Sequence, residues 1–140
     1  MNPVNAYQAG RVNGASPARL VILLYDRLLS CIEEGRVAMR EGRQLNAQVS
    51  LTHAQRIAGE LLSVLNPEAG EFTENLKNLY IYVIHTIERS KHEGNADLLA
   101  GPAGILENLR GGWVELEKRM ERGGADSPAA VELVEAGTGR

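Results

Sequence analysis

Apolar residues recur every three or four positions through four separate stretches of the chain, a spacing that predicts amphipathic helices. The clearest stretch begins at Ser16 and Pro17, which suit a helix N-cap and the first helical position, and it runs to about Met39. A helix with so apolar a face cannot remain alone in water, so it needs helical partners of similar length. The residues expected on its buried stripe are Val21, Leu24, Tyr25, Leu28, Cys31, Ile32, Gly35 and Ala38.

Three further periodic stretches follow, separated by turn signals at 41–43, at 66–70 and near Gly94. Pro102, inside the last stretch, predicts a kink or a helix that starts there. Four stripes joined by short connections predict an all-α protein, an antiparallel up-down-up-down four-helix bundle. The expected stripes are Ala47, Leu51, Ala54, Ala58, Leu61 and Leu65; then Phe72, Leu76, Leu79, Tyr80, Val83 and Ile87; then Leu98, Pro102, Ile105, Leu109, Trp113, Leu116 and Met120.

The two ends of the chain lack this period. Residues 1–14 contain three Asn, two Gly and a Pro, so we expect an extended N-terminal arm, followed by the bundle at 15–122. Residues 123–140 are rich in small residues and are expected to form a loose C-terminal tail. Tyr7 is either an ordinary residue of the arm or an anchor that lies on the bundle.

Composition narrows the class of protein. Only six of the 140 residues are aromatic, so the core must be built from aliphatic side chains, which favours helices. Fifteen Lys and Arg against eighteen Asp and Glu leave a net charge of −3, which argues against nucleic-acid binding. No run of about 18 apolar residues and no leader is visible, so neither membrane insertion nor secretion is expected and a cytoplasmic location fits.

The search for catalytic or metal-binding chemistry is negative. His53, His85 and His92 lack the spacing of a metal site and are expected to be solvent-exposed, while Cys31 falls on a buried stripe and is expected to be a small core residue. No phosphate-binding glycine loop follows a strand pattern, and the inward positions are apolar. We therefore expect neither an enzyme nor a cofactor.

Several apolar residues lie on helix faces that the core stripes do not need. Scattered surface hydrophobes are normal, but several on helices that pack together suggest a groove for an apolar segment of a partner. An alternative is a structural bundle that self-associates through such residues, with Leu23, Ile57, Val64 and Ile81 facing another copy. The candidate binding residues are Tyr7, Leu23, Val49, Ile57, Val64, Ile81 and Tyr82.

Short pieces of the chain, in order from Ala6 to about Glu117, resemble the FliS family of flagellar secretion chaperones. The departures from the family pattern are Pro102, the pair Gly111-Gly112 and the long tail after Met120, which leave the course of the last helix open. The matching pieces are Ala6-Tyr7-Gln8, Ala15-Ser16-Pro17, Leu23-Leu24-Tyr25-Asp26, His53-Ala54-Gln55-Arg56-Ile57, Glu60-Leu61, Leu76, Leu79-Tyr80, Tyr82, Leu109-Arg110 and Trp113.

The resemblance implies a bundle in the bacterial cytosol that holds the disordered C-terminal segment of flagellin and prevents its premature polymerisation. It also implies delivery of flagellin to the flagellar type III export gate, through the gate component FlhA, and an N-terminal segment that lies on the bundle and moves when flagellin binds. A homodimer remains possible. No cofactor is needed for this function.

Overall fold

The computed structural model describes residues 16–122, which are all-helical and contain no strand within that range. Four long helices are present: α2 (Pro17–Arg40), α3 (Gln44–Ser63), α4 (Glu71–Glu93) and α5 (Ala100–Glu121). A short 3₁₀ helix, η1 (Ala96–Leu99), precedes α5. The expected helical class is therefore confirmed. The predicted arm 1–14, its Tyr7 and the tail 123–140 lie outside the described residues.

Local sequence signals set the helix ends. The Ser16 hydroxyl accepts a hydrogen bond of 3.0 Å from the Arg19 backbone N–H, which satisfies one of the free donors at the start of α2. Gly94 ends α4 in the left-handed conformation, with φ of 65°, which glycine adopts without steric cost. Asn95 caps η1 through its side chain, and Pro102 lies in the first turn of α5, where its missing N–H breaks no helical hydrogen bond.

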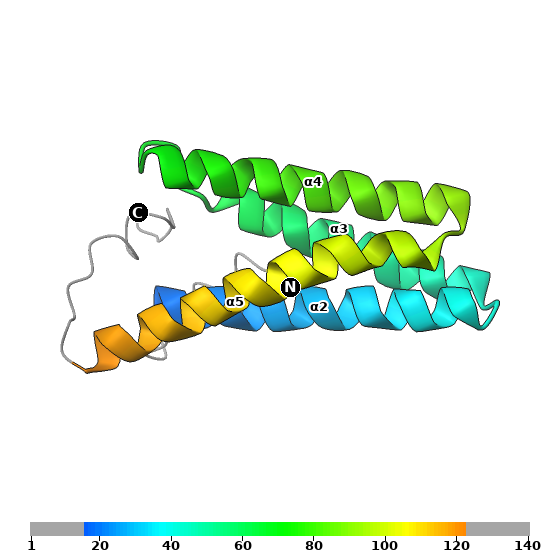
Figure 1. Cartoon of the computed structure of the whole chain (residues 1–140), viewed down its shortest axis with the longest axis horizontal. Helices are drawn as coiled ribbons and strands as arrows, with labels where there is room; N and C mark the ends of the chain where they lie inside the picture. The colour runs from blue at the N-terminus through cyan, green and yellow to red at the C-terminus, as the bar shows by residue number, and fades with distance from the viewer. Residues whose placement is uncertain (1–15, 123–140) are drawn as a thin grey trace.

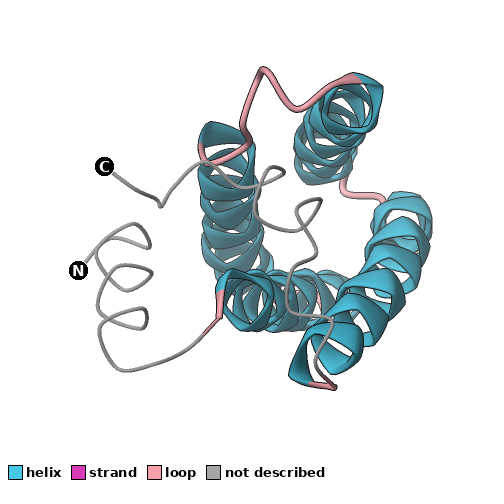
Figure 2. Cartoon of the chain, turned by 90° about the vertical axis from the view of Figure 1, so that its left-hand side faces the viewer, coloured by secondary structure: helices cyan, strands magenta, loops and turns pink. Residues whose placement is uncertain are grey.

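The helices follow one another around the bundle in chain order, so α3 lies across the core from α5 (Figure 2). Successive helices run back and forth along the long axis (Figure 1). Side-chain contacts give the same directions for two pairs. Arg19 near the start of α2 meets Glu117 near the end of α5, and Gln48 near the start of α3 bonds to the Lys91 carbonyl near the end of α4.

The core lies along the inward faces of all four long helices. Leu28, Leu51 and Val83 are fully buried, and so are most other residues of the expected stripes. Cys31 is buried as expected. Between α2 and α4, the hydroxyl groups of Tyr25 and Tyr80 lie 2.6 Å apart inside this core, so the two buried phenols satisfy each other's hydrogen-bonding needs.

Two expectations about the core are wrong. Phe72 is 53% exposed, because it stands in the first turn of α4, at the end where α5 has moved away from α4 (Figure 1). In η1 and α5 the buried line is displaced by one residue from the expected Leu98 and Ile105, which are half-buried. The residues buried on this line are Leu99, Pro102, Leu106, Trp113 and Glu117.

One residue of this buried line in α5 is charged. Glu117 is buried because both of its carboxylate oxygens accept hydrogen bonds from the Arg19 guanidinium, at 2.8 and 2.7 Å. A paired carboxylate can occupy a position that a pattern of apolar residues alone would leave at the surface.

Candidate functional site

Three of the predicted binding residues are exposed on the bundle surface. Leu23 on α2 is 50% exposed, Val49 on α3 is 60% exposed and Tyr82 on α4 is 42% exposed. Large apolar side chains in water are candidates for contact with a partner. The three residues belong to three different helices, α2, α3 and α4.

The prediction that Ile57 lies on an exposed stripe is wrong. Its side chain is 6% exposed and belongs to the buried core, and Val64, the C-cap residue about two turns further along, is half-buried against the same core. Ile81 on α4 is also half-buried. The helical period places Ile57 at the border of the α3 core stripe, and the packed bundle includes it in the core.

The tight contact between α2 and α3 is visible at Gly35. A Cβ atom placed on Gly35 would lie 2.5 Å from Leu51 Cγ, closer than real atoms approach. Only a residue without a side chain allows the backbone of α2 to come this near to Leu51. Gly35 therefore sets how closely α2 packs on α3 at Leu51.

The outer face of α3 carries two large exposed apolar side chains. Leu45 is 77% exposed and precedes Val49 by one turn, so both side chains lie on the same face. Over its 20 residues α3 carries only two charged side chains, Arg56 and Glu60. A shallow depression on this face is lined by Gln48, Val49, Thr52, His53 and Arg56.

Leu45 was not among the residues predicted to bind a partner. The signal that could have identified it is its spacing of four from Val49, together with its position just after the turn at Gly42. His53, His85 and His92 are exposed, as expected.

A second exposed apolar region lies on α4. The ring of Tyr82 reaches the first turn of α5, where a Cβ on Gly101 would lie 2.7 Å from Tyr82 Oη, so glycine makes room for the tyrosine. Phe72 in the first turn of α4 is also exposed, and the half-buried Leu79, seven residues later, lies on the same side of the helix as Phe72. Sequence reasoning assigned Phe72 and Leu79 to the core, and it missed them as surface candidates.

Burial and hydrogen bonds shift the pKa values of several groups among the described residues. Burial raises the pKa of Tyr25, of Tyr80 and of the Cys31 thiol, so all three hold their protons. A hydrogen bond from Gln55 lowers the pKa of the exposed Glu88, and Lys91 adds to this effect. No group of three metal-binding side chains occurs among residues 16–122.

The fold and its exposed apolar faces define a helical protein of the kind that binds other proteins. Comparison with known proteins gives the family. The sequence model of the family described as "Flagellar protein FliS" matches residues 1–120, and the chain belongs to this family of flagellar secretion chaperones, which is not an enzyme family.

Curated relatives agree with this assignment. The flagellar secretion chaperone FliS of Bacillus subtilis (strain 168) is 27% identical over 126 residues, which cover 89% of this chain and 94% of the relative. FliS of Escherichia coli (strain K12) is 26% identical over 106 residues, which cover 74% of this chain and 78% of the relative. Among the described helices, none combines the length and apolar character that crossing a membrane requires.

Proposed function

We propose that this chain is an up-down-up-down bundle that holds the C-terminal segment of flagellin in the bacterial cytoplasm before export. When a disordered segment becomes helical on an apolar surface, the loss of its conformational entropy offsets part of the favourable interaction energy. The complex therefore stays reversible, and flagellin can be handed to the export gate, for which FlhA is the expected contact.

The observation that carries this proposal is the exposed apolar pair Leu45 and Val49 on α3, a helix with only two charged side chains. Depletion of charged residues and exposed apolar side chains are features of protein-binding surfaces. An amphipathic client helix binds such a face through apolar residues spaced three or four positions apart. Leu23, Tyr82 and Phe72 on the other helices are further contact candidates for a client that wraps around the bundle.

Titration calorimetry with a synthetic flagellin C-terminal peptide tests the proposal. Val49→Asp should weaken binding, because the new carboxylate must lose its water when the apolar client docks. Asn78→Asp is the matched control, since it introduces the same charge at an exposed position of α4. Equal affinity of the Val49→Asp variant and the wild type would exclude the α3 face from the client site.

Self-association is the alternative use of these surfaces. Size-exclusion chromatography with and without the flagellin peptide separates the two possibilities. A monomer that forms a one-to-one complex supports the chaperone function, whereas a stable dimer that ignores the peptide supports a structural bundle.

The role of Tyr7 stays a prediction. If the arm covers part of the client surface, removal of residues 1–14 should speed or tighten flagellin binding, because fewer molecules are held in a closed state. Surface plasmon resonance on the full-length and truncated chains measures both rates. Markedly weaker binding would instead make Tyr7 part of the client surface.

A further inference from the structure

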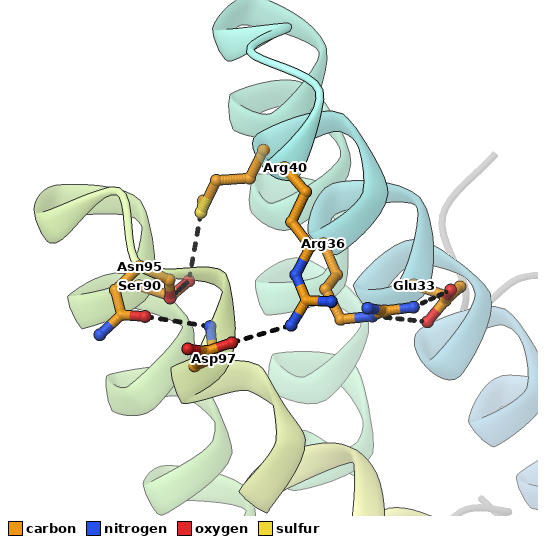
Figure 3. Close-up of polar contacts among 7 residues, drawn as sticks. Glu33, Arg36, Arg40, Ser90, Asn95 and Asp97 are labelled. Atoms are coloured by element: carbon orange, nitrogen blue, oxygen red, sulfur yellow. Dashed lines mark hydrogen bonds and ion pairs between the residues drawn. The ribbon is translucent and has the colours of Figure 1, made fainter.

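Ion pairs cross from α2 to α5 at regular intervals. Arg19 pairs with Glu117 at 2.7 Å, and Asp26 pairs with Arg110 at 2.5 Å. At the other end of α2, Arg40 pairs with Asp97 of η1 at 2.8 Å (Figure 3). On α2 the positions 19, 26 and 40 fit a spacing of seven residues, which keeps them on one side of the helix.

In this series of ion pairs, the position between Asp26 and Arg40 forms no pair with α5. The spacing of seven places Glu33 between Asp26 and Arg40, and on α5 the same spacing from Glu117 and Arg110 leads to Ala103. Alanine offers no charge, so Glu33 turns along its own helix and pairs with Arg36, as Figure 3 shows. This pairing lowers the pKa of Glu33.

A hollow of about 720 Å³ lies at this position, between α2, η1 and α5. Three of its lining residues are alanines of η1 and α5, whose short side chains leave space. Buried Ile32 and Leu99, with half-buried Leu29, give the hollow an apolar floor. The three alanines are Ala96, Ala100 and Ala103.

The charges around the hollow do not balance. Three carboxylates, Glu33, Asp97 and Glu107, face two guanidinium groups, Arg36 and Arg40, which leaves one negative charge over. Glu107 is exposed and forms no ion pair with another residue of the described helices. An apolar floor below an uncompensated carboxylate suits a long side chain that is apolar along its stem and positive at its tip.

We propose that this hollow binds an arginine or lysine side chain of a partner protein, presented on a segment that also carries leucine-like residues. The stem of the basic side chain covers the apolar floor, and its cation lies near Glu107 and Glu33, where α5 supplies no basic residue of its own. Of the predicted flagellin-binding residues in the range 16–122, none lines the hollow, so a second partner can bind there while those residues hold flagellin.

Nuclear magnetic resonance with model peptides tests this proposal on the full chain. The probe is an amphipathic peptide of leucine and arginine, and a leucine–glutamate peptide of equal length controls for apolar contact. The leucine–arginine peptide should shift the amide signals of Leu29, Ala103 and Glu107. Shifts confined to other surfaces, or equal shifts from both peptides, would overturn the proposal.

Two variants give the site its specificity test. Glu107→Gln should weaken binding of the leucine–arginine peptide by about two- to fivefold, the scale of one exposed ion pair. Glu115→Gln removes the same charge from an exposed position of α5 outside the hollow and should leave the affinity unchanged. If both substitutions weaken binding equally, the peptide senses only net charge and the specific site is refuted.

Ala103→Arg supplies the missing basic group from α5 itself. The new side chain should fill the hollow and meet Glu33, so the variant should melt no lower than the wild type and should no longer bind the peptide at this surface. Retained binding with unchanged shifts at Leu29 would overturn the proposal. Concentration-dependent changes at these residues without peptide would assign the hollow to a second copy and would also refute it.

Discussion

At the scale of single residues, the fold depends on positions where a side chain must be absent. Gly35 lies on the buried stripe of α2, against Leu51 of α3, and leaves no room for a methyl group. Gly59 in α3 is also helical, yet a Cβ there would meet nothing within 4 Å. The same substitution should therefore have opposite effects at the two positions.

Gly35→Ala should lower the free energy of unfolding by about 1–3 kcal/mol, because overpacking outweighs the gain in helix propensity. Gly59→Ala should raise it by up to about 1 kcal/mol, since only the propensity gain remains. Urea denaturation measures both. A stabilised Gly35→Ala variant would mean that Leu51 can move aside at little cost.

The buried pair Tyr25 and Tyr80 makes stability depend on alkaline pH. Desolvation raises the pKa of both phenols above the usual value near 10.0. As pH rises past this value, the unfolded chain loses protons that the folded chain keeps, so the free energy of unfolding falls. The contribution is fully present below the unfolded pKa and is lost as pH approaches the folded pKa.

Tyr80→Phe removes one of these protons. At neutral pH the variant should lose about 1 kcal/mol, because Tyr25 loses its hydrogen-bond partner. Between about pH 9.5 and 11 its free energy of unfolding should fall less steeply than that of the wild type. Denaturant unfolding at several pH values across this range measures the difference. An equal fall of the free energy of unfolding in both proteins would show that Tyr80 ionises normally in the folded protein.

At the scale of one element, α3 has apolar residues on two sides, one of which is buried while the other is exposed. Ile57 belongs to the core at 6% exposure, whereas Val49 is 60% exposed, although the sequence made both candidates for the partner surface. The helical period places a residue at an angle around its own axis. The position of the neighbouring helix then decides whether that angle is buried.

Ile57→Asp should lower the free energy of unfolding by at least about 3 kcal/mol, since it removes core contacts and buries a carboxylate. Val49→Asp should change it by no more than about 0.5 kcal/mol, as expected at an exposed position. Thermal melts followed by circular dichroism compare the two variants. Equal melting temperatures of the two variants would show that the Ile57 side chain is not part of the core.

At the scale of the whole molecule, Arg19 and Glu117 join the two ends of the described chain, 98 residues apart. Arg19→Ala should cost about 1–2 kcal/mol, because the buried Glu117 carboxylate loses its charged donor. The exposed pair of Arg43 and Glu41 provides the control, since Arg43→Ala should cost no more than about 0.5 kcal/mol. Chemical denaturation measures both, and similar losses would mean that Glu117 finds another donor or water.

The sequence alone determined the helices of this protein. Ser16, Gly42 and Gly94 act through their own backbone conformation or nearest neighbours, so the ends of α2 and α4 and the turn before α3 follow from local chemistry. The family was also readable from short pieces of sequence, and the family comparison confirmed it.

Only the tertiary structure decided which side chains at the edges of the stripes meet water. Phe72 is exposed at the end where α5 diverges from α4 (Figure 1), Ile57 is buried at the border of the α3 core stripe, and Glu117 is buried because Arg19 pairs with it. Each outcome depends on how one helix is placed relative to another. The period of a single helix does not contain this placement, because helix packing is set by contacts between the elements.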